Sequence, residues 1–193
     1  MAPSKEIIII GGPNGAGKTT AAGVLLPRTI AITEFVNADE IARGMSPNDV
    51  DGAAFAAGRA MLERLKALLD QEKSFAFETT CAGLGHLALL RNAKARGWQV
   101  SLLFLWLPSP EAALARVAQR VRQGGHDIPP DVIARRYWKG MVNARDRYLP
   151  LSDLARIYDN SDARRILVAE KSQELGFKVH DSKIWAIIES VRS

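Results

Sequence analysis

Hydrophobic and polar positions follow two patterns along the chain, and their order predicts an α/β fold. Short apolar runs without alternation are typical of buried strands in a parallel sheet. Longer stretches with apolar residues three and four positions apart are typical of amphipathic helices. The predicted strands are 7–10, 34–37, 73–77, 100–107 and 156–158. The predicted helices are 19–26, 40–43, 52–71, 86–96, 110–123, 131–148 and 184–191.

Turn and cap residues support several of these boundaries. Pro27 interrupts the pattern after the first helix. The sequence Ser-Pro-Glu at 109–111 is a strong helix start, because it supplies a capping hydroxyl, a proline at the first helical position and an acid in the first turn. Segments 166–169 and 177–180 are predicted to form a small hairpin or edge strands.

The loop after the first strand carries the strongest chemical signal. Its sequence, Gly-Pro-Asn-Gly-Ala-Gly-Lys-Thr at 12–19, matches the phosphate-binding pattern G-x-x-x-x-G-K-[ST]. Glycines let backbone N–H groups approach a polyphosphate, and the following helix points its positive dipole end at the same anion. Lys18 can reach the β- and γ-phosphates, and Thr19 can offer a hydroxyl to Mg²⁺. The residues assigned to ATP are Gly12, Pro13, Asn14, Gly15, Ala16, Gly17, Lys18, Thr19 and Thr20.

The alternative for this loop is a glycine-rich turn that only joins a strand to a helix. Its position between a buried strand and a predicted helix favours the phosphate-binding interpretation. Strand 100–107 ends in Leu-Pro and carries no aspartate. We therefore expect Mg²⁺ to be held by Thr19 and waters, with Asp39 or Glu78 behind them.

Polar side chains follow two other strands. Asp39 comes just after strand 34–37, and Glu78, Thr79 and Thr80 follow strand 73–77. Ligands bind beyond the carboxyl ends of strands in open α/β sheets, so we expect a catalytic role for Asp39. An acid and two hydroxyls after the next strand are expected to face the phosphate loop. Two structural alternatives stay open: Asp39 could cap the helix that follows, and the residues after strand 73–77 could form an ordinary polar loop.

Residues 111–150 are predicted to form an arginine-rich lid. They contain eight Lys or Arg against four Asp or Glu, and seven of the eight are arginines, which bind phosphate bidentately. Arg116 and Arg120 stand four apart and share a helix face, whereas Arg122 points elsewhere. The alternative is a solvated basic face. We assign Arg120 to catalysis, Arg116 to ATP, and Arg135 and Arg136 to the acceptor.

Composition limits the classes of partner. At 193 residues, the chain is predicted to be one domain, 1–193, that includes the lid. The net charge of +5 suits polyanionic small molecules and does not require nucleic acid. One cysteine, Cys81, excludes an internal disulfide and a cysteine metal cluster. The longest apolar run is too short for a bilayer and the N-terminus lacks a signal-peptide core, so we expect a cytoplasmic protein without a membrane partner.

Taken together, these motifs resemble the zeta-toxin family of small bacterial kinases. The resemblance covers about residues 5–170. It implies a three-layer, adenylate-kinase-like fold with five parallel strands in the order 2-3-1-4-5 and a helical lid. The motifs that carry it are the phosphate loop at 12–19, Asn-Ala-Asp at 37–39, Phe-Glu-Thr-Thr at 77–80, the arginine-rich lid and Asp-Asn-Ser at 159–161.

The resemblance also implies roles for individual residues. Lys18 is implied as the phosphate-loop lysine and Asp39 as the base that faces the acceptor hydroxyl, while Glu78 and Thr80 line the acceptor pocket. Arg116 and Arg120 look like the lid pair of adenylate-kinase-like enzymes, in which one arginine stacks on adenine and one contacts phosphates. Zeta toxins phosphorylate a sugar hydroxyl of UDP-N-acetylglucosamine, and a toxin role implies an antitoxin partner.

The favoured function is therefore an ATP-dependent kinase of a small hydroxyl-bearing acceptor, such as a nucleotide sugar. Asn160, in the turn after strand 156–158, is expected near the base of ATP. Two alternatives stay open. One is an ATP-switched binding module, which does not need Asp39 or Glu78. The other is a polynucleotide 5′-hydroxyl kinase, which is disfavoured because the basic segment has only Tyr137 and Trp138 for stacking on bases.

Overall fold

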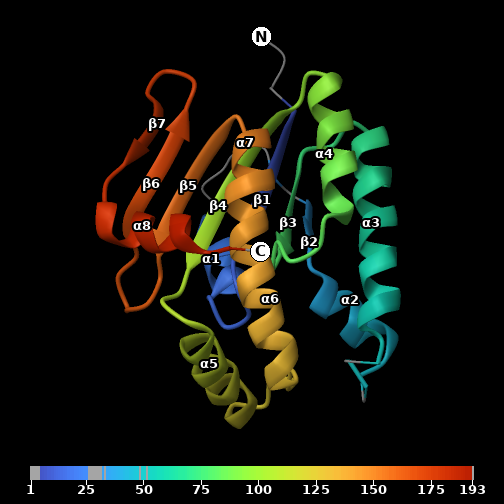
Figure 1. The fold of residues 1–193 in the computed structure, drawn as a ribbon. Helices are drawn as coiled ribbons and strands as arrows, with labels where there is room; N and C mark the ends of the chain where they lie inside the picture. Colours follow the sequence, from blue (N-terminus) through green and yellow to red (C-terminus); the bar gives the residue numbers. More distant parts are fainter. Residues whose placement is uncertain (1–4, 26–31, 33, 48, 51, 193) are drawn as a thin grey trace.

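A seven-stranded mixed sheet forms the centre of the molecule (Figure 1). The computed structural model describes residues 5–25, 32, 34–47, 49–50 and 52–192. The strand order is β2-β3-β1-β4-β5-β6-β7, in which the first five strands pair in parallel and β6 and β7 are each added by antiparallel pairing. This confirms the predicted parallel order 2-3-1-4-5. The strands are β1 (Glu6–Gly11), β2 (Glu34–Val36), β3 (Phe75–Thr79), β4 (Gln99–Trp106), β5 (Leu154–Asp159), β6 (Ile166–Ser172) and β7 (Gly176–Val179).

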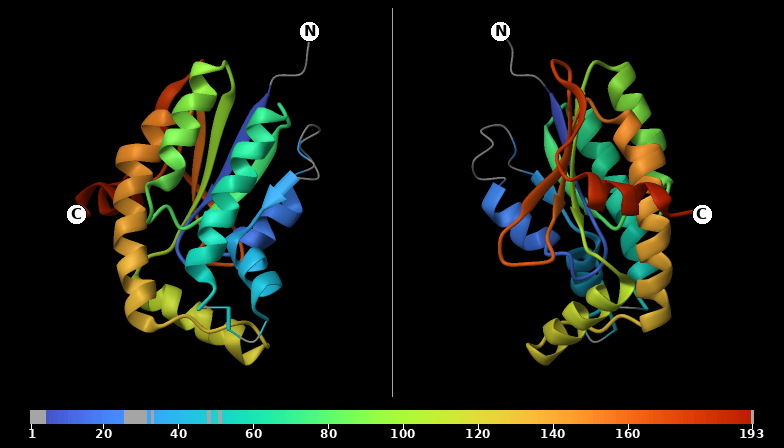
Figure 2. Two further views of the ribbon diagram at one scale, coloured as in Figure 1. Left: turned by 90° about the vertical axis from the view of Figure 1, so that its right-hand side faces the viewer. Right: turned by 60° about the vertical axis from the view of Figure 1, so that its left-hand side comes forward.

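Helices cover both faces of the sheet, which is why its central strands are apolar on both sides. Figure 2 shows α1 on one face and α3, α4 and α6 on the other, while α2 and α5 lie beyond the carboxyl ends of the strands. Ile7, Ile9 and Phe77 are fully buried between these layers. The helices on this sheet are α1 (Lys18–Leu25), α2 (Ala38–Met45), α3 (Ala54–Asp70), α4 (Gly85–Ala95), α5 (Pro110–Arg122), α6 (Pro130–Asn143), α7 (Leu149–Leu151) and α8 (Ser182–Ser190).

Several predicted boundaries moved by two residues or more. β3 begins and ends two residues later than predicted, so Glu78 lies inside the strand, opposite Ile10 of β1, and does not follow it. The predicted hairpin is present as β6 and β7, which extend the main sheet at its edge. The predicted break at Pro27 lies outside the described residues. No helix in the described part of the chain is both long and apolar enough to cross a membrane.

The predicted helix 131–148 is one helical segment with a change of winding inside it. α6 continues into a π-helical turn, η2 (Ala144–Tyr148), and then into α7. On one side, Asn143 and Tyr148 donate hydrogen bonds of 2.8–3.1 Å to the carbonyls of residues 81–83. These contacts fix the segment that follows β3. On the other side, Arg145 Nη1 donates to the carbonyls of residues 188, 189 and 191, each at 2.9 Å, at the end of α8.

Candidate active site

A cleft of about 220 Å³ lies at the carboxyl ends of the parallel strands. The phosphate loop, the start of α1, the start of α2, the end of β3 and one face of α5 meet there. Most of the residues assigned to ATP, catalysis or Mg²⁺ therefore come together in space. The lining residues are Asn14, Gly15, Gly17, Lys18, Thr19, Thr20, Asp39, Glu78, Arg116 and Arg120.

The phosphate loop requires glycine at two positions for steric reasons. Gly12 has φ +148° and Gly15 has φ +75°. A Cβ atom at Gly12 would lie 2.5 Å from the Leu105 carbonyl oxygen, and one at Gly15 would lie 2.9 Å from that of Ala113. The loop thus packs closely on β4 and α5. Because α1 begins at Lys18, the unpaired N–H groups of its first turn open toward an anion in the cleft.

Lys18 is a buried ammonium with few partners. Its residue is 7% exposed, and its Nζ donates to the Pro13 carbonyl at 2.9 Å, which is the one hydrogen bond of this group among the described residues. The Glu78 carboxylate lies 3.8 Å from Nζ. Burial lowers the pKa of Lys18 because the charged ammonium loses its hydration, and the carboxylates of Glu78 and Asp39 oppose that shift. An ammonium has three donors, so Lys18 retains donors for phosphate oxygens.

Asn37 organises the acidic side of the cleft. Its Oδ1 accepts a hydrogen bond from the Asp39 backbone N–H at 2.8 Å and so caps α2. Its Nδ2 donates to Glu78 Oε2 at 3.1 Å, and the Thr19 hydroxyl donates to the same oxygen at 2.8 Å. The alternative in which Asp39 caps the helix is therefore wrong, because Asn37 does so. The Asp39 side chain is 45% exposed in the cleft.

The two lid arginines lie on one face of α5, as their spacing predicts. Arg116 Nη2 donates to the Ser161 carbonyl at 2.5 Å. Arg120 Nη2 donates to the His126 carbonyl at 3.0 Å, and its Nε is buried without a hydrogen-bond partner among the described residues. Both arginines line the cleft, whereas Arg122 is exposed and is not among the lining residues.

His126, in the loop after α5, lies beside the cleft residue Asp39, although no role was expected for it from the sequence. Its Nε2 lies 3.8 Å from Asp39 Oδ2, and its side chain is 15% exposed. A single histidine without a partner at regular spacing gives no sequence signal. Its position directly after Gly124 and Gly125, at the end of the predicted lid helix, was the available clue.

Seven assigned residues lie outside the cleft lining: three in the phosphate loop, Gly12, Pro13 and Ala16, and four elsewhere. Thr80 accepts a long hydrogen bond of 3.5 Å from the Ala82 N–H. Arg135 is exposed and Arg136 half-buried on α6. Their roles toward the acceptor stay predictions. Asn160 Nδ2 donates to the Ala16 carbonyl at 2.7 Å, so the turn after β5 is tied to the phosphate loop, and its contact with the base stays a prediction.

The residues present fit ATP with Mg²⁺. Five buried side-chain polar atoms lack a partner in the described part of the chain, and two of them belong to cleft residues: Asn14 Oδ1 and Arg120 Nε. An unpaired buried polar group costs about 1–3 kcal/mol, so a polar ligand is favoured here. The described residues include no group of three or more His, Cys, Asp or Glu that could hold a metal ion. Mg²⁺ commonly takes one or two protein ligands beside phosphate oxygens, and the Thr19 hydroxyl backed by Glu78 suits that arrangement.

Two solved structures resemble this one over 100% of the chain. The AvrRxo1-ORF1:-ORF2 complex with ATP has a TM-score of 0.73 and 17% identity, and this chain spans 65% of that chain. A chain from the structural characterization of the toxin–antitoxin system PezAT of Streptococcus pneumoniae has a TM-score of 0.69 and 14% identity, and this chain spans 81% of that chain. At these identities the likeness is one of fold. It confirms the expected zeta-toxin-like, phosphate-loop fold.

Sequence comparisons place the chain in a family. An uncharacterized protein of Haemophilus influenzae is 30% identical over 126 residues, which are 65% of this chain and 88% of that protein. Residues 7–139 match the family model AAA_33, described as an AAA domain. The match includes the phosphate loop, Asp39, Glu78 and α5. The chain therefore belongs to this AAA-domain family of phosphate-loop proteins.

Proposed function

We propose that the protein is an ATP-dependent kinase that transfers the γ-phosphate to a hydroxyl of a small molecule, such as a nucleotide sugar. One observation carries the proposal. A buried lysine with free donors, a lid arginine with an unpaired Nε and an exposed carboxylate line the same cleft. The cations suit the phosphates of ATP and the carboxylate suits the acceptor hydroxyl, which are the two reactants in phosphoryl transfer.

The nucleotide half consists of the phosphate loop, Lys18, Thr19 and Arg120. Charge spreads over the phosphate oxygens as the γ-phosphoryl group leaves ADP, so preorganised cations in a desolvated cleft stabilise the transition state most. Lys18 holds the β- and γ-phosphates, and Arg120 turns its guanidinium from the His126 carbonyl to the γ-phosphate. The Thr19 hydroxyl would hold Mg²⁺, which would supply charge neutralisation at the phosphates.

The acceptor half centres on Asp39. Because Asn37 caps α2, the Asp39 carboxylate is not needed for the helix. It orients the acceptor hydroxyl and takes its proton as the hydroxyl oxygen bonds to phosphorus and the bond to the β–γ bridging oxygen breaks. Glu78 holds the Thr19 hydroxyl and Asn37 Nδ2, so we assign it to ordering the site more than to contacting the acceptor.

The lid is α5 with the loop and helix that follow, about residues 111–150 of a single domain. Its cleft-facing arginines contact backbone carbonyls of residues 126 and 161, which are weak partners compared with a triphosphate. ATP therefore offers the lid a better set of acceptors. This difference favours closure on the nucleotide.

The acceptor class rests on the resemblance to zeta toxins, which phosphorylate a sugar hydroxyl of UDP-N-acetylglucosamine. Both similar structures are two-component assemblies, and one of them is a toxin–antitoxin system. A nucleotide sugar as acceptor and an antitoxin as partner are the corresponding proposals for this chain.

The test is direct transfer of label from γ-labelled ATP with Mg²⁺. The acceptors are UDP-N-acetylglucosamine, other nucleotide sugars, free sugars and a 5′-hydroxyl oligonucleotide. Label on a sugar hydroxyl with the parent protein, greatly reduced with Asp39→Asn and retained with Glu40→Gln, supports the proposal. Glu40 is an exposed acid next to Asp39 on α2 and serves as the matched control. Label on the oligonucleotide, or ATP binding without transfer to any acceptor, would favour the polynucleotide kinase or the switch instead.

A further inference from the structure

His126 makes two contacts in different directions, one through its side chain and one through its backbone. The imidazole Nε2 lies 3.8 Å from Asp39 Oδ2. The carbonyl oxygen of the same residue accepts a hydrogen bond from Arg120 Nη2 at 3.0 Å. One residue thus touches the candidate base and the candidate lid arginine, which come from α2 and α5.

The loop that carries His126 has little freedom beside Arg120. A Cβ atom at Gly125 would lie 2.6 Å from Arg120 Cγ and 3.0 Å from the Arg120 carbonyl oxygen. The Gly125 N–H donates to that carbonyl at 3.0 Å. The chain therefore turns tightly over α5, and this turn places the His126 ring against α2, where its side chain is 15% exposed.

The Asp39 carboxylate needs a hydrogen-bond partner to hold it in one orientation. Its side chain is 45% exposed, so its carboxylate can adopt several rotamers. The other charged groups that line the cleft are Lys18, Glu78, Arg116 and Arg120. Lys18 and the two arginines are assigned to ATP, and the Glu78 carboxylate has no proton to donate. The His126 imidazole is therefore the neighbouring side chain left to hold the Asp39 carboxylate.

We propose that His126 is a positioning residue: its imidazole holds the Asp39 carboxylate toward the acceptor hydroxyl, and its carbonyl holds the Arg120 guanidinium until ATP binds. The proposal rests on the proposed kinase function and deepens it. At 3.8 Å, a side-chain rotation brings the imidazole and the carboxylate into hydrogen-bond range. Because His126 lies in the loop that follows α5, closure of the proposed lid would bring the imidazole to Asp39 and the base to its working orientation.

The chain offers a matched control. His180 Nε2 lies 2.9 Å from Glu170 Oε1, an imidazole–carboxylate pair on the β6–β7 side of the sheet, outside the cleft lining. If an imidazole–carboxylate contact contributed only to stability, the two pairs would respond alike. If His126 positions the base, only its removal changes phosphoryl transfer.

The first test needs no enzymatic activity. The chain has three histidines, His86, His126 and His180, so their ring resonances can be assigned by single substitutions. Asp39→Asn should shift the His126 ring resonances and leave those of His180 unchanged, whereas Glu170→Gln should do the reverse. Identical His126 resonances in the parent and Asp39→Asn would overturn the contact and with it the proposal.

The second test is kinetic and separates positioning from folding. His126→Ala removes the ring but keeps the carbonyl that holds Arg120. We expect the rate of phosphoryl transfer to fall about tenfold to a hundredfold, with little change in the KM for ATP. A rate loss of this size is typical when a catalytic group is displaced from its working position. His126→Gln should recover part of the loss because its amide nitrogen can reach the carboxylate, and His180→Ala should match the parent.

A double-substitution cycle completes the kinetic test. If His126 acts through Asp39, His126→Ala should cause no further loss in an Asp39→Asn background. Full additivity of the two losses, or equal small effects of His126→Ala and His180→Ala, would overturn the positioning role. If the parent transfers phosphate to no acceptor, the proposed kinase function fails, and the ring spectra still decide whether His126 holds Asp39.

Discussion

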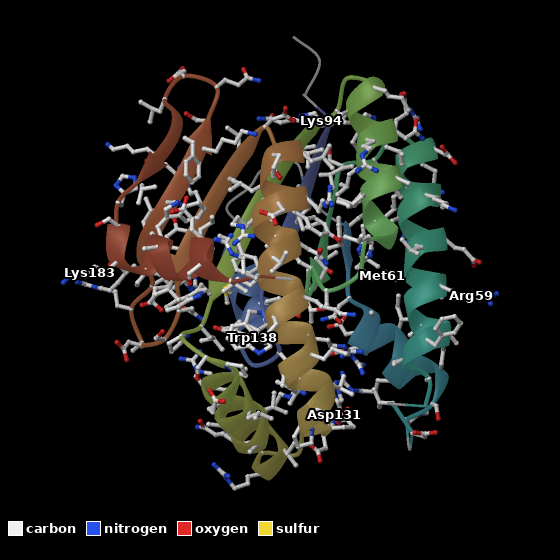
Figure 3. All side chains as sticks on the ribbon, viewed as in Figure 1. Arg59, Met61, Lys94, Asp131, Trp138 and Lys183 are labelled. Atoms are coloured by element: carbon white, nitrogen blue, oxygen red, sulfur yellow. The ribbon has the colours of Figure 1, made fainter. Side chains whose placement is uncertain are left out.

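Two lysines at opposite ends of the sheet show how differently one side chain can be used. Lys94 lies at the end of α4 away from α5, as Figure 3 shows. Its Nζ is 2.5 Å from Asp153 Oδ1 and also donates to the Leu151 carbonyl at 2.9 Å. The other Asp153 oxygen accepts from the Val100 N–H at 2.9 Å, so this pair ties β4 to the start of β5.

Lys18 carries the same ammonium group but, among the described residues, has no carboxylate within hydrogen-bond distance. Its nearest carboxylate in the described structure is 3.8 Å away, and burial lowers its pKa. A buried, under-paired charge opposes folding unless a ligand completes it. The ion pair at the amino end of the sheet therefore contributes to stability, and we expect the carboxyl end to bind a polyanion. Substitutions at the two ends should therefore separate turnover from stability.

The largest expected effect at the carboxyl end is that of Asp39→Asn. Loss of a base or orienting carboxylate typically lowers the rate about 10²–10⁴-fold. ATP affinity and the thermal midpoint should stay near the parent values, because Asn37 caps α2. Single-turnover transfer, calorimetric ATP binding and thermal melting measure the three quantities. A much lower thermal midpoint would show that Asp39 contributes mainly to the stability of the fold.

Arg120→Ala should rank next, with transfer lowered about 10²-fold and a smaller loss of ATP affinity. A lid arginine acts mainly on the charge that develops in the transition state. Arg116→Ala should show the reverse balance, because stacking on the base is a ground-state contact. Exposed Arg122 is the control and should tolerate alanine. Equal, small effects at all three positions would mean that α5 is only a solvated basic face.

Lys18→Ala removes the under-paired ammonium group of the phosphate loop. A charge-assisted contact is worth about 1.5–3 kcal/mol, so ATP affinity or turnover should fall at least tenfold. Without ATP, the variant should be as stable as the parent or more so, because a buried ammonium is removed. The rise in thermal midpoint on adding ATP should shrink. Parental turnover in Lys18→Ala would contradict the phosphate-loop assignment.

Lys94→Met should have the smallest effect on turnover and a clear effect on stability. It leaves the Asp153 carboxylate and the Leu151 carbonyl without their shared donor, which costs about 1–3 kcal/mol. Denaturant unfolding measures this loss, and Lys66→Met, at an exposed lysine on α3, is the control. A turnover loss as large as that of Lys18→Ala would erase the distinction between the two ends.

The fold could be predicted because its signals are local. The unbroken apolar run at β1 and the Ser-Pro-Glu start of α5 specify their elements within a few residues. The phosphate loop and the four-residue spacing of Arg116 and Arg120 are equally local, and all of them meet in the cleft. Parallel strands then force their carboxyl ends to one edge, which brings Asp39 near the loop.

What the sequence did not reveal depends on contacts between distant segments or on fine backbone geometry. Asn37 and Asp39 are equally good capping residues, and only the extended backbone of Asn37, with φ −129° and ψ 123°, decides between them. The polar side chain of Glu78 suggests that the strand ends before this residue, yet β3 continues to pair with β1 as far as Thr79. The approach of His126 to Asp39 joins two loops that no periodicity connects.

The π turn η2 has a consequence for how this chain can tolerate change in length. An α-helix rotates by about 100° per residue, and a π turn accommodates one residue more than an α turn. Asn143 faces the segment after β3, and Arg145 faces the end of α8. Deleting one residue within the turn would let it wind as a regular α turn, whereas deleting one residue of α6 before it would rotate everything beyond by about a third of a turn. We conclude that insertions and deletions in α6 are constrained more tightly than substitutions, since the phase of this helix sets its contacts with residues 81–83 and with the end of α8 at once.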